Sequence, residues 1–275
     1  MKTYSFNFMK DFGLNTARAI LVTGSNGQLG KTIEELYSKD MRYDFTFVSK
    51  EQLDISNEEE VKFFFKNNKF DYCINCAAYT NVEQAEKTPE IAYRVNAEGV
   101  KNLAEVCRQN NTILIHISTD YVFDGEKQEP YTIKDTPNPI NEYGKSKLLG
   151  EKHIQEILKR HFIIRTSWLY SKKHGENFYK KIVEKAQIEK ELFITDQQKG
   201  CPTDTVSLAQ YILELIKLRN VNYGIYHYCD KQVMTWYEFA KLILANSGII
   251  NQMTLIPRAY DSSVRRPRYS VLSFE

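Results

Sequence analysis

A tyrosine and a lysine four residues apart, Tyr143 and Lys147, are the residues of this 275-residue chain best placed to do chemistry. If the segment is helical, they lie on one face about one turn apart. An ammonium near a phenol favours the phenolate, so we expect Lys147 to lower the pKa of Tyr143 from its usual value of about 10. Tyr143 then acts as a proton donor near neutral pH. The hydroxyl of Thr119 completes the predicted catalytic group.

Three glycines spaced by threes, Gly24, Gly27 and Gly30, follow an apolar run near the start of the chain. The pattern is typical of a buried strand that turns tightly into a helix and lets the backbone approach a pyrophosphate. The helix N-terminus supplies free N–H groups and the positive end of a dipole for the phosphates. The sequence therefore predicts a dinucleotide-binding loop.

A phosphate-binding loop of nucleotide hydrolases is an alternative interpretation, because Gly30-Lys31-Thr32 matches the end of that motif. The motif needs a glycine five residues before its second glycine, and Ser25 stands there. This interpretation also leaves Tyr143 and Lys147 without a role. We therefore favour dinucleotide binding.

Charge and cysteine content narrow the class of protein. The 37 lysines and arginines nearly balance the 35 acids, so net charge gives no reason to expect a nucleic acid or an anionic membrane as partner. No apolar stretch has the length that a membrane span needs. Five cysteines fit a reducing cytosol, so we expect a cytoplasmic protein. Cys73 and Cys76 fall in one predicted strand and point to opposite faces, and we expect no metal.

Strands and helices alternate from residue 19 onward. Strands are expected at 44–48, 71–78, 112–117 and 162–165, a capping box at 56–59 starts one helix, and 89–109 is expected to be a continuous amphipathic helix. Asn141 is expected to cap the helix that carries Tyr143. This rhythm predicts an α/β fold with a doubly wound parallel Rossmann sheet. Because ligands bind at the carboxyl ends of such strands, the glycine loop, Thr119 and Trp168 should converge on one crevice.

The rhythm becomes irregular after Trp168, which indicates a second part of the chain. Helices are expected at 177–188, 205–218 and 236–247, a strand at 224–229, and loop or short extended pieces at 257–275. We predict an N-terminal extension at 1–17 and a dinucleotide-binding Rossmann domain at 18–170, with 203–229 returning to it. A smaller C-terminal substrate-binding lobe is predicted at 171–202 and 230–275.

Several motifs, spread from about residue 18 to the end, form a specific combination. They are Thr23-Gly24-x-x-Gly27-x-x-Gly30, Leu53-Asp54-Ile55, Asn75-Cys-Ala-Ala78-Tyr-Thr80, Val95-Asn96-Ala97, Ser118-Thr-Asp-Tyr-Val-Phe123-Asp-Gly125, Tyr143-Gly-Lys-Ser-Lys147-x-x-Gly150-Glu151, Arg165-Thr-Ser-Trp168 and Arg266-Pro267. This combination resembles the dTDP-4-dehydrorhamnose reductase family of extended short-chain dehydrogenase/reductases. The resemblance implies that NADPH, with NADH also accepted, reduces the C4 ketone of a dTDP-linked 4-keto-6-deoxy sugar. The conversion of dTDP-4-dehydro-L-rhamnose to dTDP-L-rhamnose is the expected reaction.

The resemblance also implies roles for individual residues. Tyr143 would protonate the C4 oxygen, Lys147 would hold the nicotinamide ribose, and Thr119 would hydrogen-bond the C4 oxygen. Besides the three glycines and Lys147, the implied cofactor-binding residues are Asn26, Gln28, Leu29, Ser49, Asp54, Ile55, Ala77, Ala78 and Tyr79. The implied substrate-binding residues are Thr80, Val82, Thr119, Asp120, Tyr121 and Trp168.

Two further residues and the oligomeric state have less specific expectations. Trp168 either contacts the sugar nucleotide or is a structural aromatic between the two parts of the chain. Asn96 is expected to tie backbone segments together rather than to act in catalysis. A homodimer is compatible with the resemblance.

Cofactor preference is predicted from the end of the second strand. A site that prefers NAD has an acid there to bind the ribose hydroxyls, whereas Ser49 and Lys50 can attract the 2′-phosphate of NADP. NADPH is therefore expected to be preferred over NADH. The preference should be modest, because an exposed ion contact is screened by salt.

Related activities remain alternatives. A sugar-nucleotide 4,6-dehydratase has an Asp-Glu pair after the threonine, whereas Asp120 is followed here by Tyr121, which favours ketone reduction. Another nucleotide-sugar 4-ketoreductase or an epimerase would use the same tyrosine and lysine. A non-catalytic regulatory subunit of the methionine adenosyltransferase type also resembles this family, but the intact Thr119, Tyr143 and Lys147 argue against that role.

Overall fold

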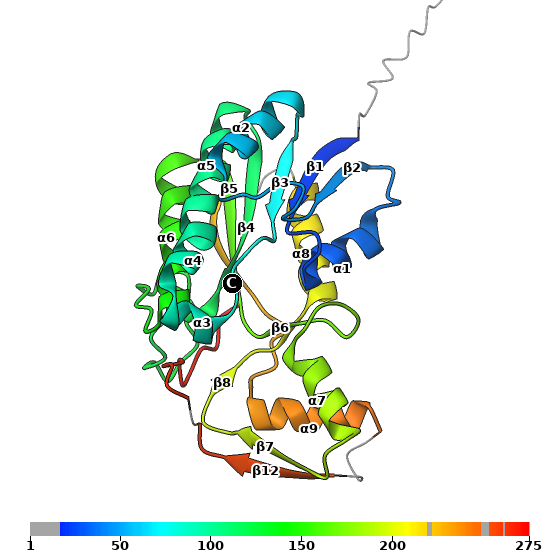
Figure 1. Cartoon of the computed structure of the whole chain (residues 1–275), viewed down its shortest axis with the longest axis vertical. Coiled ribbons are helices and arrows are strands. Elements are labelled where there is room, and N and C mark those ends of the chain that lie inside the picture. Colours follow the sequence, from blue (N-terminus) through cyan, green and yellow to red (C-terminus); the bar gives the residue numbers. More distant parts are fainter. Residues whose placement is uncertain (1–16, 219–221, 249–252, 261, 275) are drawn as a thin grey trace, which may run out of the picture.

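Six parallel strands form the central sheet of the computed structural model, in the order β10-β5-β4-β3-β1-β2 (Figure 1). They are β1 (Arg18–Thr23), β2 (Tyr43–Val48), β3 (Tyr72–Asn75), β4 (Ile113–Thr119), β5 (His161–Thr166) and β10 (Gly224–Tyr228). The strand order reverses beside β1, and open α/β sheets bind ligands at such a switch point. The predicted doubly wound α/β fold is confirmed.

The structure describes residues 17–218, 222–248, 253–260 and 262–274. The predicted extension at 1–17 therefore lies outside the described residues, except for residue 17. In Figure 1 the described chain begins at β1, which lies next to the edge strand β2. Its last segment returns to the carboxyl ends of the strands.

Helices cover both faces of the sheet (Figure 1). On one face lie α2 (Glu58–Asn67), α5 (Gly99–Gln109) and α6 (Glu142–Ile157), and on the other lie α1 (Gln28–Tyr37) and α8 (Thr205–Lys217). Successive residues of a strand point to opposite faces, so Leu21 packs in the core beneath α5 whereas Ile20 and Val22 pack beneath α8. Burial on both faces explains why these strands are continuous apolar runs.

A second, smaller layer lies below the sheet in Figure 1. It contains α7 (Phe178–Ala186), α9 (Trp236–Asn246) and the parallel pair β7 (Glu191–Thr195) and β12 (Thr254–Arg258). Its core is separate from those of the sheet and includes Ile182, Leu192, Phe239, Ile243 and Leu244. Two short strand pairs lie near the points where the chain passes between the layers: β6 (Leu169–Tyr170) with β9 (Thr203–Asp204), and β8 (Lys199–Gly200) with β11 (Met234–Thr235).

We propose domain boundaries at 18–170 with 203–229, and at 171–202 with 230–275. In the segment 203–229, β10 pairs with β5 and α8 packs on α1. This segment therefore belongs with the sheet rather than with the smaller layer. The separate core of α7 and α9 supports the lobe.

Two predicted helix features are wrong in detail. The cap of α2 is Asn57, whose side chain accepts the N–H of Glu60, while Ser56 donates its hydroxyl to Asp54. The helix predicted at 89–109 is divided into α4 (Pro89–Tyr93), a π-helical segment (Arg94–Glu98) and α5. The amide of Asn96 in that segment forms hydrogen bonds with both backbone groups of Tyr79. π-Helical segments of this kind are frequent at functional sites.

The helix α6 (Glu142–Ile157) begins as the sequence predicts. Asn141 caps it by accepting the N–H of Gly144 at 2.8 Å. A short helix, α3 (Val82–Lys87), and a 3₁₀ turn at Asp120–Val122 lie nearby. Gly150 lets α6 approach the π-helical segment, because a Cβ there would lie 2.1 Å from the carbonyl oxygen of Asn96.

We therefore expect Gly150→Ala to lower the free energy of unfolding by roughly 1–3 kcal/mol, as overpacking does in a close-packed core. The alanine's higher helix propensity of about 1 kcal/mol offsets part of this cost. Chemical denaturation measures the change, with Lys152→Ala at an exposed position of α6 as the control. A Gly150→Ala protein as stable as the control would contradict the contact.

Candidate active site

A cleft of about 560 Å³ opens at the carboxyl ends of the central strands, where the smaller layer meets the sheet. Its walls contain the three predicted catalytic residues, most of the glycine loop and all of the predicted substrate-binding residues. The lining includes Asn26, Gly27, Gln28, Leu29, Gly30, Thr80, Val82, Thr119, Asp120, Tyr121, Tyr143, Lys147 and Trp168.

A second hollow of about 290 Å³ shares Asn26, Gly27, Cys76 and Ala78 with this cleft and extends it past the end of β2. The remaining predicted cofactor residues, apart from Ser49, line it: Gly24, Asp54, Ile55, Ala77 and Tyr79. The two hollows together form one elongated site across the switch point. This shape suits a dinucleotide with a second ligand at its reactive end.

The glycine loop has the geometry of a pyrophosphate cradle. Gly24 has a φ of +64°, and a Cβ there would lie 2.6 Å from the backbone of Ala77. Among the described residues no side chain caps α1, and its first turn carries no acid. The first N–H groups of α1 and its positive dipole end are therefore available to an anion.

The catalytic candidates come from two elements that pack together. Tyr143 and Lys147 lie on α6, and Thr119 ends β4. Thr119 and Tyr143 both line the cleft, and Thr119 opposes the rise that burial causes in the pKa of Tyr143. The ring of Tyr121 packs edge-on to that of Tyr143 with centroids 5.8 Å apart. The structure thus brings together the three groups that the sequence selects.

The predicted effect of Lys147 on Tyr143 is not what the structure has. Burial raises the pKa of Tyr143 to about 12, the Thr119 hydrogen bond opposes the rise, and the charge of Asp120 adds to it. Lys147 instead donates to the carbonyl oxygen of Ile117 at 2.7 Å, and burial lowers its own pKa to about 8. The expected depression of the phenol pKa is therefore wrong for the unliganded chain, and Tyr143 keeps its proton at neutral pH.

Asp120 is a buried carboxyl group beside the catalytic candidates. Burial raises its pKa to about 7, although hydrogen bonds from Ser270 and Thr119 oppose the rise. Its Oδ2 has no hydrogen-bond partner among the described residues. Asp120 therefore changes charge near neutral pH and presents an unsatisfied oxygen at the cleft.

Trp168 lies against a partner that no local sequence pattern selects. Its ring stacks on that of Trp236 with centroids 3.6 Å apart, and both line the cleft. Trp168 has a φ of +46°, and Gly200 is needed beside it because a Cβ there would lie 2.6 Å from the indole. Trp168 thus packs with the smaller layer and also faces the ligand space, which are the two roles the sequence left open.

Asn96 lies as expected for a residue that ties backbone together. Its oxygen accepts the N–H of Tyr79 at 2.9 Å, and its amide donates to the Tyr79 carbonyl and to Ser146. These bonds attach the segment after β3 to α6.

Ser49 is the predicted cofactor residue that the structure does not bring to either hollow. Its hydroxyl donates to Glu51 at 2.6 Å, whereas Lys50 and Glu51 themselves line the second hollow. The hydrogen bond from Ser49 lowers the pKa of Glu51, which stays ionised at neutral pH. Sequence reasoning missed this acid, although its place three residues after Val48 at the end of β2 was a usable signal.

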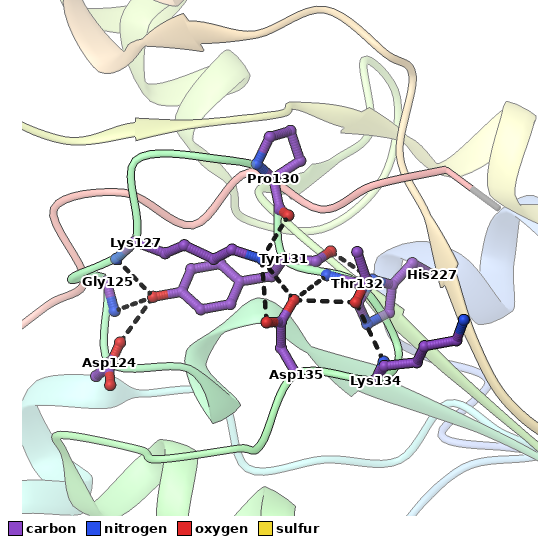
Figure 2. Close-up of polar contacts among 9 residues, drawn as sticks. All are labelled: Asp124, Gly125, Lys127, Pro130, Tyr131, Thr132, Lys134, Asp135 and His227. Carbon is purple, nitrogen blue, oxygen red and sulfur yellow. Dashed lines mark hydrogen bonds and ion pairs between the residues drawn. The ribbon is translucent and has the colours of Figure 1, made fainter.

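The loop between the 3₁₀ turn and α6 is held by Tyr131 (Figure 2). Its hydroxyl donates to Asp124 at 2.7 Å and accepts the N–H groups of Gly125 and Lys127. Its carbonyl oxygen faces Nδ1 of the buried His227 on β10 at 3.0 Å. The segment that leads from Thr119 to α6 is therefore anchored to the sheet.

A third hollow, of about 510 Å³, is lined by three arginines near the end of the described chain and by two acids, Asp124 and Glu126. Arg265, Arg266 and Arg268 line it together with Gln198. The Nε of Arg266 and the Nε2 of Gln198 are buried and have no hydrogen-bond partner among the described residues. Unpartnered donors beside three guanidinium groups favour an anionic ligand.

Neither a metal-ligand cluster nor a membrane-spanning helix is present in the described ranges. They contain no group of three or more His, Cys, Asp or Glu side chains placed to hold a metal ion. Cys76 lies beyond the end of β3, and it packs toward the core opposite to that of Cys73. No described helix has both the length and the apolar character that crossing a bilayer requires.

Comparison with known proteins gives the family. The family model described as RmlD substrate binding domain matches residues 18–275. A dTDP-4-dehydrorhamnose reductase from Aggregatibacter actinomycetemcomitans is 34% identical over 266 residues, covering 92% of this chain and 90% of that protein. A dTDP-4-keto-6-deoxy-D-glucose reductase from Streptomyces niveus is 35% identical, covering 93% of this chain and 88% of its own.

A solved structure agrees with these relatives. The crystal structure of dTDP-4-dehydrorhamnose reductase from Bacillus anthracis str. Ames in complex with NADP matches with a TM-score of 0.89 and 36% identity, covering 94% of this chain and 91% of that one. The chain therefore belongs to the dTDP-4-dehydrorhamnose reductases, a family of NADP-dependent oxidoreductases among the extended short-chain dehydrogenase/reductases.

Proposed function

We propose that this chain reduces the C4 ketone of a dTDP-4-keto-6-deoxy sugar, with dTDP-4-dehydro-L-rhamnose as the substrate and dTDP-L-rhamnose as the product. The observation that carries the proposal is the placement of protonated Tyr143 beside Thr119 in a cleft that is continuous with a dinucleotide cradle. NADPH, when bound, supplies the hydride. The name of the relative from Aggregatibacter actinomycetemcomitans supports the substrate.

The chain's own residues account for the other parts of the reaction. Tyr143 donates its phenol proton to the C4 oxygen, and Thr119 hydrogen-bonds that oxygen while charge develops on it. Lys147 binds the nicotinamide ribose. The backbone N–H groups at the start of α1 hold the pyrophosphate, and the residues of the second hollow surround the adenosine.

Substrate contacts are proposed on the opposite side of the cleft. Thr80, Val82, Asp120, Tyr121 and Trp168 are the proposed contacts, and Trp236 joins them because it stacks on Trp168. The hollow with three arginines is a suitable place for the charged nucleotide part of the substrate. A cytoplasmic location and a homodimer remain predictions.

One specific observation favours a second candidate substrate. The similar protein from Streptomyces niveus is named a dTDP-4-keto-6-deoxy-D-glucose reductase, and it differs in the sugar rather than in the type of reaction. The same tyrosine, threonine and lysine would reduce either ketone. Assays with both sugar nucleotides decide between them.

The proposed reaction is tested by NADPH oxidation with and without a dTDP-4-keto-6-deoxy sugar. Oxidation should require the sugar, and Tyr143→Phe should lower kcat by at least about a hundredfold, because a positioned general acid contributes on the order of 10²–10⁴. NADPH affinity should stay nearly unchanged in this variant. Lys147→Ala should lower both turnover and cofactor affinity. Near-normal turnover by Tyr143→Phe would exclude this tyrosine as the proton donor.

The cofactor preference should depend on two neighbouring residues with opposite effects. Lys50→Gln removes a cation from the second hollow and should lower the NADPH-to-NADH ratio of kcat/KM by about fivefold, the size of an exposed ion contact. Glu51→Gln removes the adjacent anion and should raise this ratio by a similar factor. Both effects should shrink as salt is added. A ratio that is unchanged in both variants would place the 2′-phosphate elsewhere.

Recognition of the charged part of the substrate should depend on Arg266. Arg266→Gln removes a guanidinium and should raise KM for the sugar nucleotide by about tenfold, the loss expected for one charge-assisted hydrogen bond. The KM for NADPH should not change. Arg42→Gln, at an exposed arginine paired with Asp40 far from the hollow, is the matched control. Equal KM values in the two variants would contradict this assignment.

A further inference from the structure

A buried row of polar side chains runs from β1 to the catalytic lysine. Thr23 donates its hydroxyl to Oδ1 of Asn75 at 2.8 Å, Nδ2 of Asn75 lies 3.0 Å from Nδ1 of His116, and Nε2 of His116 lies 3.3 Å from Nζ of Lys147. None of the four is more than 2% exposed. Buried polar groups are costly unless they are paired, so the donors and acceptors in this row must match.

The orientation of the Asn75 amide is fixed by a backbone group. The N–H of Ala77 lies 3.1 Å from Oδ1 of Asn75. A backbone N–H can only donate, so the atom that faces it is the amide oxygen and the NH₂ group faces His116. Nδ1 of His116 must therefore accept.

The proton of His116 is then placed on its other nitrogen. Burial lowers the pKa of His116 well below its usual value, so the ring is neutral and carries one proton. With Nδ1 accepting, this proton is on Nε2, which faces Nζ of Lys147. An ammonium group has only donors, whereas a neutral amine has a lone pair that accepts this N–H.

The other tautomer of His116, with its proton on Nδ1, places two hydrogen-bond donors opposite each other at a different point of the row. If the ring proton is on Nδ1, it faces the NH₂ group of Asn75 at 3.0 Å, and two donors oppose each other there. Lys147 donates to the carbonyl oxygen of Ile117 in either charge state. A neutral Lys147 is thus the state in which every group of the row is satisfied.

The other titratable groups around Lys147 do not reverse this result. On α6, Glu151 lies one turn away, but both its oxygens accept from Arg165. Beside β3, burial raises the pKa of the Cys76 thiol, so it is uncharged. Tyr143 keeps its proton. Among the described residues these groups leave no unpaired anion to hold an ammonium.

We propose that His116 is a positioning residue for Lys147: its Nε2–H faces Nζ, donates to the neutral amine and thereby disfavours the ammonium form. Burial lowers the pKa of Lys147 to about 8, which is the direction that this contact also favours. The catalytic consequence rests on the proposed function, because a lysine that titrates near neutrality can gain and lose a proton during turnover. The protonation state itself is a property of the unliganded chain.

The tautomer of His116 is tested directly by ¹⁵N NMR of the histidine rings in the unliganded wild-type chain. The His116 signals are assigned through their couplings within the residue, and their loss in His116→Leu checks the assignment. We expect a neutral ring with its proton on Nε2. A proton on Nδ1, or a charged ring, overturns the proposal.

The titration midpoint of Lys147 shows whether Nε2 of His116 donates to Nζ or accepts from it, because loss of His116 shifts the midpoint in opposite directions in the two cases. Its ¹³Cε signal, identified by its loss in Lys147→Arg, should titrate near pH 8 in the wild type. In His116→Leu the opposing donor is gone, so the midpoint should rise by about one pH unit. If Nε2 instead accepts from an ammonium, the same variant lowers the midpoint, and the proposal fails.

A nearly isosteric variant tests the same point without an apolar substitution. The carboxylate of Asn75→Asp accepts a proton from Nδ1, which leaves Nε2 free to accept from the ammonium. The titration midpoint of Lys147 should rise more in this variant than in the double variant Asn75→Asp/His116→Leu. In the double variant only the charge of the new carboxylate acts on Lys147, from a distance. Equal rises overturn the proposal. These measurements use no ligand, so their failure is distinct from a failure of reductase activity.

Discussion

One buried ion pair fixes the position of α6, the helix that carries Tyr143 and Lys147. Arg165 on β5 donates through Nε and Nη2 to the carboxylate of Glu151 on α6, the shorter contact being 2.7 Å, and Ser118 on β4 donates to the same carboxylate. Glu151 and Arg165 are 0% and 2% exposed. Removal of one partner would leave an unpaired buried charge, which costs about 3–5 kcal/mol. The pair therefore sets how α6 sits on the two strands, and Lys147, one turn earlier, meets the end of β4.

This position of α6 also requires the absence of side chains at two glycines. A Cβ at Gly144 would lie 2.2 Å from the carbonyl oxygen of Tyr121, and one at Gly150 would meet the π-helical segment. Because Gly144 has no side chain, the start of α6 beside Tyr143 can contact the 3₁₀ turn that follows Thr119. The polar anchor and the two close approaches act on the same helix, so the distance between phenol and threonine hydroxyl is set by packing and not by loop conformation.

Local patterns allowed much of this site to be predicted, whereas its electrostatics depend on distant segments. The glycine spacing, the alternation of strands and helices, and the cap at Asn141 are each encoded within a few residues. The pKa of Tyr143 is not, because it depends on burial by the opposite wall and on Asp120. Trp236 reaches the cleft from a segment some seventy residues beyond Trp168 and has no local signal. The cap of α2 did have one, because asparagine caps helices as well as serine does.

The protonation states in the unliganded site bear on the direction of the chemistry. An epimerase built on the same tyrosine and lysine first oxidises its substrate, and that step needs a phenolate as base. Here burial keeps Tyr143 protonated with a pKa of about 12, and a carboxyl group beside it raises rather than lowers that value. The site is therefore prepared to donate a proton to an oxygen that gains charge, which favours reduction of a ketone over its reverse.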